Sequence, residues 1–210
     1  MFKDRLNAAR QLALALKKYR GQNPLVLAIP RGAVPMTAWI ADALNGQMDV
    51  VLVRKLRAPS QPEVAIGAVD ETGLAYLSPC ATTWGLDPQY VKDEIKRQMK
   101  TLKSRRGQYS QIRPPIPVQG RVVIVVDDGL ATGATMMSAL KALRQHHPQR
   151  LVCAIPVASP DALANIKPLA DETVCLSAPE DFMAVAQFYQ EFPQIDDAQV
   201  LALLQTKFTA

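Results

Sequence analysis

The chain has 210 residues, of which 49% are hydrophobic and 20% are charged. This length and composition predict one globular domain with a sizeable core, and the hydrophobic runs are too short to cross a membrane. The net charge of +5 favours anionic ligands, but no Lys/Arg block with interleaved aromatic residues indicates a nucleic-acid surface, so a phosphorylated small molecule is the simpler partner.

The first 45 residues predict a helix, a strand and a second helix. The start, MFKDRLNAAR, lacks the apolar core of a signal peptide, so we expect a cytoplasmic protein. Apolar residues spaced by three and four predict an amphipathic helix over 2–19, and a core strand follows over 25–29. The strand leads into Pro30-Arg31-Gly32. A cation beside a glycine at a strand end suits an oxyanion, although an ordinary turn with a solvated arginine is the alternative.

A second strand, over 49–53, runs directly into the basic segment RKLRAPSQPE, which begins at Arg54 and Lys55 and ends at Glu63. Cations followed by prolines and small polar residues predict an exposed, mobile connection and not a core element. Because this connection follows a strand of the sheet, it is a candidate for binding anions, with a solvated basic loop as the alternative.

The next segment predicts a hairpin and a long helix. Strands over 64–69 and 74–77 are separated by a glycine-containing turn, and Asp87-Pro88 begins the helix. The apolar stripe of this helix is Tyr90, Ile95, Met99 and Leu102. Its cations are expected on the solvated face, with RNA contact as the less favoured alternative. These cations are Lys92, Lys96, Arg97, Lys100, Lys103, Arg105 and Arg106. The proline-rich stretch 108–120 predicts an extended connector.

The centre of the chain is RVVIVVDDGLATGAT, residues 121–135. The five residues 122–126 are all β-branched, which predicts a strand buried on both faces of a parallel sheet. Asp127 and Asp128 follow at the carboxyl end of that strand, where open α/β sheets bind ligands. We therefore expect both carboxylates to face a ligand crevice.

The loop after the acids predicts a phosphate site. Gly129 and Gly133 allow a sharp turn and a close approach of the backbone, and Thr132 and Thr135 supply hydroxyls beside the N-terminus of a following helix. Together, acids and loop suit a sugar phosphate, because carboxylates accept hydrogen bonds from vicinal hydroxyls. An ordinary strand-turn-helix with a capping residue is the alternative.

These residues resemble the 5-phosphoribosyl-1-pyrophosphate (PRPP) motif of the type I phosphoribosyltransferases, in which hydrophobic residues precede Asp-Asp and Ala-Thr-Gly-x-Thr. The motif is not a Walker A loop, because no Gly-Lys-Thr/Ser follows the glycines. The resemblance implies that Asp127 and Asp128 bind the ribose hydroxyls. It implies that the 5′-phosphate is bound by Ala131, Thr132, Gly133, Ala134 and Thr135.

The resemblance also assigns roles upstream of the motif. Pro30, Arg31 and Gly32 would bind the pyrophosphate, and a cis peptide common in the family would fall between Pro30 and Arg31. Arg54 and Lys55 would open a catalytic loop that closes over the departing pyrophosphate. Hypoxanthine-guanine enzymes of the family carry an acid where this chain has Ala131, so we expect the general base elsewhere. Glu63, on the same mobile loop, is the candidate.

The last third of the chain completes an α/β pattern. Strands over 150–157 and 172–176 flank a helix that begins at Ser159-Pro160. Alternating strands and helices predict a doubly wound, mainly parallel sheet, the Rossmann-like type I phosphoribosyltransferase fold, with a β-hairpin lid region. We expect one domain over 1–210, with a lid or insertion at 56–120 and a small C-terminal lobe at 178–210.

The lobe carries four aromatic residues and a short predicted helix over 196–204. Aromatic residues at this spacing more often pack in a core than form a shelf for a nucleobase. The four aromatic residues of the lobe are Phe182, Phe188, Tyr189 and Phe192. A subgroup of predicted bacterial phosphoribosyltransferases resembles nearly the whole chain, including RKLRAPSQPEVAIGAV, DDGLATGAT and FMAVAQFYQEFPQIDD.

The resemblance implies a glycosyltransferase that moves phosphoribose from PRPP to a nitrogenous acceptor, a nucleobase above all, and releases pyrophosphate. It implies magnesium held through PRPP and not by dedicated protein ligands. A non-catalytic sensor of PRPP or nucleotides is the alternative, and dimers are frequent in the family. A cysteine hydrolase is disfavoured, because Cys153 and Cys175 lie in strand-like runs while His146 and His147 end a helix.

Overall fold

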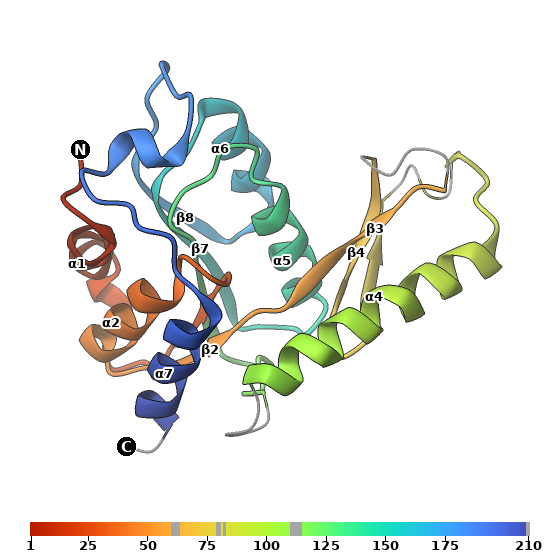
Figure 1. The fold of residues 1–210 in the computed structure, drawn as a ribbon, viewed down its shortest axis with the longest axis horizontal. Coiled ribbons are helices and arrows are strands. Elements are labelled where there is room, and N and C mark those ends of the chain that lie inside the picture. Colours follow the sequence, from red (N-terminus) through yellow and green to blue (C-terminus); the bar gives the residue numbers. More distant parts are fainter. Residues whose placement is uncertain (60–63, 79–80, 82, 110–114, 209–210) are drawn as a thin grey trace.

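A five-stranded parallel sheet forms the centre of the protein (Figure 1). The computed structural model describes all residues except 60–63, 79–80, 82, 110–114 and 209–210. The strands lie in the order β2-β1-β6-β7-β8, and every neighbouring pair is parallel. They are β1 (Leu25–Ala28), β2 (Gln47–Val50), β6 (Val122–Val126), β7 (Arg150–Val157) and β8 (Glu172–Ser177). The predicted doubly wound parallel sheet is confirmed.

Helices cover both faces of this sheet. α1 (Arg5–Ala15) and α2 (Val34–Leu44) pack on one face, and α5 (Ala134–Arg144) and α6 (Pro160–Ile166) pack on the other. Alternate residues of β6 serve the two faces: Ile124 and Val126 join the core under α1 and α2, whereas Val123 and Val125 join the core under α5 and α6. Burial on both faces explains why this strand is apolar throughout.

Several predicted boundaries shift because of local hydrogen bonds. The helix predicted over 2–19 begins only at Arg5, because the Asp4 side chain accepts a hydrogen bond from the Asn7 N–H (2.6 Å) and caps the helix. It ends at Ala15, followed by the 3₁₀ turn η1 (Lys17–Tyr19). Two further 3₁₀ turns are η2 (Lys167–Leu169) and η3 (Val185–Phe188), and the last helix is α7 (Asp197–Phe208).

A second unit, which we call the arm, comprises residues 53–109 and projects beside α5 (Figure 1). Its antiparallel sheet has the order β3-β4-β5. The strands are β3 (Val53–Arg57), β4 (Ala65–Asp70) and β5 (Ala75–Leu77), and α4 (Pro88–Tyr109) packs against them. The predicted hairpin is thus confirmed. The proposed division into a lid at 56–120 and a lobe at 178–210 stays a prediction.

The prediction of a loop beginning at Arg54 and Lys55 is wrong for residues 54–57. Both residues lie in β3, which pairs with β4, and Leu56 is fully buried. A single buried residue between exposed cations is the alternation of a strand with one face on a core. The predicted strand over 49–53 likewise divides, because β2 ends at Val50 and Val53 already belongs to β3.

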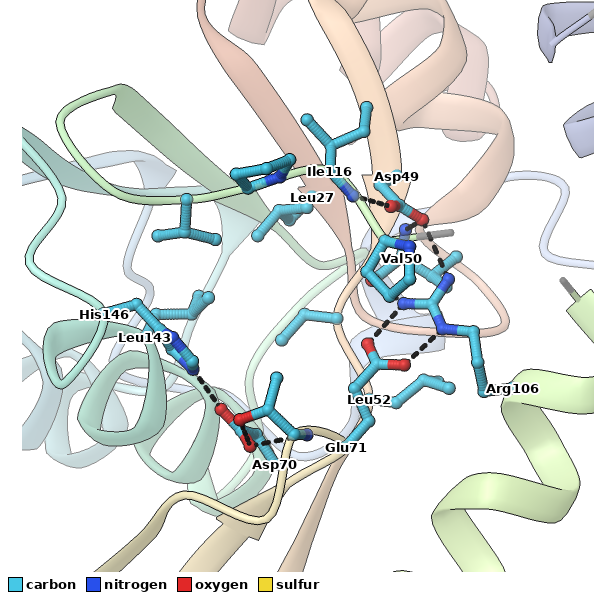
Figure 2. A pocket seen from close by; sticks show the side chains of 15 residues that line it. Leu27, Asp49, Val50, Leu52, Asp70, Glu71, Arg106, Ile116, Leu143 and His146 are labelled. Carbon is cyan, nitrogen blue, oxygen red and sulfur yellow. Dashed lines mark hydrogen bonds and ion pairs between the residues drawn. The ribbon is translucent and has the colours of Figure 1, made fainter. Parts of the chain in front are cut away.

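Charged residues join the arm to the sheet around a cavity of about 180 Å³ (Figure 2). Arg106 of α4 forms ion pairs with Asp49 of β2 (3.1 Å) and with Glu71 after β4. His146, after α5, contacts Asp70 at the end of β4. We call these five residues the joint. Arg106 was expected on a solvated face, and that prediction is wrong because two carboxylates compensate its charge in the interior.

The C-terminal segment packs on the core as predicted for its aromatic residues. Phe182 and Phe188 stack with ring centroids 5.3 Å apart, and Tyr189 lies 4.7 Å from Phe192. Tyr189 is buried, and the other three aromatic side chains are half-buried against the core. Among the residues that the structure describes, no helix has the length and hydrophobicity needed to cross a membrane.

Candidate functional site

The acid pair lies directly after β6, at the carboxyl edge of the parallel sheet. The Asp128 N–H donates a hydrogen bond to Oδ1 of Asp127 (2.9 Å). Burial, together with the charge of Asp128, raises the pKa of Asp127 well above its usual range. Two adjacent carboxylates at this edge can accept hydrogen bonds from vicinal hydroxyls, provided that their negative charge is compensated.

Arg5 supplies part of that compensation, at Asp128. Its Nε and Nη2 atoms lie 2.9 and 2.8 Å from Oδ2 of Asp128. Burial raises the pKa of Asp128, while the hydrogen bond and charge of Arg5 oppose that rise. Sequence reasoning missed Arg5. The available signal was its position four residues before Ala9 and seven before Leu12, on the buried face of α1.

The predicted phosphate loop has the expected shape. Gly133 has φ of 68°, in the left-handed region, and immediately precedes α5. The side chains of Thr132 and Thr135 are exposed, and Thr132 Oγ1 accepts a long hydrogen bond from the Ala134 N–H (3.4 Å). Hydroxyls and the unpaired N–H groups of a helix N-terminus therefore lie together, an arrangement suited to a phosphate. The binding role of residues 131–135 stays a prediction.

The loop at Pro30–Gly32 lies against the acid pair. The peptide bond between Pro30 and Arg31 is cis, as the family resemblance implied. A Cβ atom on Gly32 would lie 2.0 Å from Asp128 Oδ2, so only glycine allows this approach. Arg31 points instead to the C-terminal helix, where it forms an exposed ion pair with Asp197 (3.5 Å).

Four cations of the arm line a pocket of about 360 Å³. We call it the basic pocket, and its polar and charged lining residues are Arg54, Lys55, Arg57, Arg105, Thr135 and Ser138. Pro30 and Val53 complete the lining, so the pocket touches both predicted anion-binding loops and contains no acid among its described residues. Burial and the neighbouring charges of Arg105 and Arg57 lower the pKa of Arg54. These cations repel one another, and the charge of Glu94 offsets part of that repulsion at Arg54.

Sequence reasoning found only part of this pocket. Arg54 and Lys55 were predicted as site residues, but Arg105 was assigned to the solvated face of the long helix. No local pattern distinguishes Arg105 from its neighbours, because only the packing of α4 against β3 brings it to the pocket. Glu63, the predicted base, lies outside the described residues and stays a prediction.

Among the residues that the structure describes, no contact joins a cysteine to a histidine. Cys153 is buried within β7, and the Cys175 thiol donates to the Ser177 carbonyl (3.0 Å). His146 belongs to the joint, and His147 has φ of 51° in the turn before β7. Within the described part of the chain, no three His, Cys, Asp or Glu side chains cluster as metal ligands. Asp127 and Asp128 do offer the one or two carboxylates that magnesium uses when a substrate phosphate supplies further ligands.

Residues 3–192 match the family model described as "Phosphoribosyl transferase domain". Two Mycobacterium tuberculosis proteins, each named "Putative phosphoribosyl transferase", are 39% identical over 205 residues. The alignment covers 97% of this chain but 46% of each relative, so the chain spans about half their length.

Solved structures agree with these sequence matches. The crystal structure of TT1426 from Thermus thermophilus has a TM-score of 0.91 and 44% identity, and the match covers 98% of both chains. A hypothetical protein from Neisseria gonorrhoeae with bound ppGpp has a TM-score of 0.53 and 13% identity over 98% of both chains. At that identity, the second match speaks for the fold alone.

Proposed function

Because the chain belongs to the phosphoribosyltransferase family, we propose that it transfers phosphoribose from PRPP to a nitrogenous acceptor, with a nucleobase as the expected class. The observation that carries the proposal is the basic pocket. It adjoins both the Pro30 loop and Thr135 of the phosphate loop, and its four cations have no acid among the described lining residues. A phosphorylated ligand with a pyrophosphate group would meet complementary charge there.

The sheet side of the site would hold the sugar phosphate. Asp127 and Asp128 would accept hydrogen bonds from the ribose hydroxyls, while the N–H groups and hydroxyls of residues 131–135 would bind the 5′-phosphate. Because α5 and β6 fix these groups before the ligand arrives, they would orient the anomeric carbon with little rearrangement.

The arm would act on the leaving group. As the bond from the anomeric carbon to pyrophosphate oxygen breaks, its electron pair stays with that oxygen, and Arg54, Lys55, Arg57 and Arg105 would stabilise the developing charge. The acceptor nitrogen then bonds to the carbon and loses its proton, for which Glu63 remains our proposed base. Bound magnesium would neutralise part of the pyrophosphate charge.

Pyrophosphate release tests this proposal directly. The purified protein would be incubated with PRPP, magnesium and each member of a panel of purine and pyrimidine bases. We expect acceptor-dependent release of pyrophosphate, and its loss in the Lys55→Ala variant. Lys96→Ala is a matched control, because Lys96 is exposed on α4 and does not line the basic pocket. PRPP binding without release for any acceptor would contradict transfer.

A sensor of PRPP or a polyphosphorylated nucleotide is the second candidate function. The four cations favour it as well, because they suit a polyphosphate whether or not a bond breaks. Since the Neisseria protein contains ppGpp, that nucleotide is a sensible second probe beside PRPP. Calorimetric binding of either ligand without turnover would favour the sensor.

A further inference from the structure

Arg5 connects three parts of the chain that are distant in sequence. It begins α1 and is 9% exposed. Two of its nitrogens bind Oδ2 of Asp128, and Nη1 donates to the Pro193 carbonyl (2.6 Å). Its guanidinium lies 3.7 Å from the centroid of the Phe192 ring. The hydrogen bonds in the plane of the group and the ring beside it thus restrict its orientation.

The C-terminal segment also holds the backbone of Asp128. The Tyr189 hydroxyl donates to the Asp128 carbonyl (2.7 Å). Burial, and next the charge of Asp128, raise the pKa of Tyr189, so the phenol keeps the proton that it donates. Asp128 is therefore fixed at its carbonyl by Tyr189 and at one carboxylate oxygen by Arg5.

The two carboxylate oxygens of Asp128 differ in their partners. Among the residues that the structure describes, no side chain donates a hydrogen bond to Oδ1, whereas Oδ2 receives both Arg5 donors. The backbone of Gly32 closes the space beside Oδ2, since even a methyl group there would overlap that oxygen. A carboxylate fixed in this way can present Oδ1 in a single direction.

We propose that Arg5 is a positioning residue for the ribose of the transferred group. By binding Oδ2, it fixes the Asp128 carboxylate so that Oδ1 is directed to a ribose hydroxyl. The inference rests on the proposed function, because it names a residue that acts on the same site through Asp128. Arg5 itself does not touch the substrate in this arrangement.

A purely structural role for Arg5 predicts a different result. An ion pair that only joins α1 to the C-terminal segment would change stability and affect every ligand of the site alike. A positioning role predicts instead that removing Arg5 weakens the binding of ligands that carry a ribose and leaves the binding of ligands without a ribose unchanged.

The test compares Arg5→Met, which removes the charge but keeps an extended side chain, with Arg10→Met. Arg10 lies on the exposed side of the same helix, over the Trp39 ring, and is a matched control. Calorimetry would measure the affinity of each variant for PRPP with magnesium and for inorganic pyrophosphate, which has no ribose. Urea denaturation would measure the stability of each variant separately.

For Arg5→Met we expect PRPP binding about 10- to 100-fold weaker, the range for hydrogen bonds to a charged group. Pyrophosphate binding should stay unchanged, and Arg10→Met should match the parent protein. Unchanged PRPP binding, or an equal loss for pyrophosphate, overturns the inference. If Arg5→Met does not fold, Arg5→Lys keeps the charge without the paired donors, and we expect about tenfold weaker PRPP binding with unchanged pyrophosphate binding.

The two proposals fail in distinguishable ways. If the parent protein binds no PRPP, the proposed function is wrong, and the ribose role of Arg5 falls with it. If the parent binds PRPP and Arg5→Met binds it equally well, only the inference about Arg5 is wrong.

Discussion

The sheet contributes negative charge to the site and the arm contributes positive charge. The two charges differ in how far they are compensated before a ligand binds. At the sheet, Arg5 compensates Asp128, one of the two acids, before a ligand binds. In the arm, the four cations of the basic pocket face no acid among the described lining residues. The sheet side is therefore assembled in advance, whereas the arm side gains stabilisation when an anion arrives. Variants of the two sides should accordingly affect different measurements.

The largest expected effect comes from removing both acids on the sheet side. Charge-assisted hydrogen bonds contribute about 1.5 to 3 kcal/mol each, so Asp127→Asn with Asp128→Asn should weaken PRPP binding by about 3 to 6 kcal/mol. Calorimetry with magnesium and PRPP measures the loss. Unchanged affinity in the folded double variant would remove both acids from the ribose site.

The second-largest effect concerns the joint and should appear in the stability of the protein. Arg106→Met leaves Asp49 and Glu71 without their buried cation, and breaking such a pair destabilises a protein by about 3 to 5 kcal/mol. Urea denaturation would measure the free energy of unfolding, with Lys100, an exposed cation of the same helix, replaced in the control Lys100→Met.

The effect of Arg106→Met should depend on pH. Burial already raises the pKa of Glu71, and Arg106 opposes that rise, so the pKa rises further in the variant. A group whose folded-state pKa is raised contributes stability at low pH and loses it as pH rises through that pKa. We therefore expect less destabilisation at pH 5 than at pH 8. A larger loss at pH 5 would exclude this account of the joint.

The third prediction concerns the arm during turnover. If Arg54 and Lys55 act mainly on the departing pyrophosphate, Arg54→Ala and Lys55→Ala should each lower kcat by about 10²- to 10³-fold, the range for one donor to a developing anion. PRPP affinity should change much less, because transition-state contacts affect rate more than ground-state binding. Equal losses in kcat and affinity would identify a static anchor for PRPP instead.

The smallest expected effect belongs to one hydroxyl of the phosphate loop. Thr132→Val removes a hydrogen-bonding group but keeps the shape of the side chain, so ribose 5-phosphate should bind about 0.5 to 1.5 kcal/mol more weakly. Pyrophosphate affinity should not change, since Thr132 does not line the basic pocket. A loss for pyrophosphate alone would place Thr132 on the leaving-group side.

The sheet side was predictable from sequence because local patterns determine it. A run of β-branched residues, two acids and a glycine before a helix identify β6, its edge and the loop within fifteen residues. The arm side was less predictable, since β3 shows only one buried residue, Leu56, among cations. Arg5 and Arg105 reach the site only through packing between distant segments, which no spacing in the sequence records.

The route of the chain through the arm has a consequence for how the protein can diverge. β2 and β6 run parallel on either side of β1, and parallel strands need a long crossover to join them. The arm and its connector occupy the position of that crossover. Insertions or exchanges within it leave the strand order intact, so leaving-group recognition can evolve separately from sugar-phosphate recognition. Among relatives, we expect sequence and length to vary more in the arm than in the sheet.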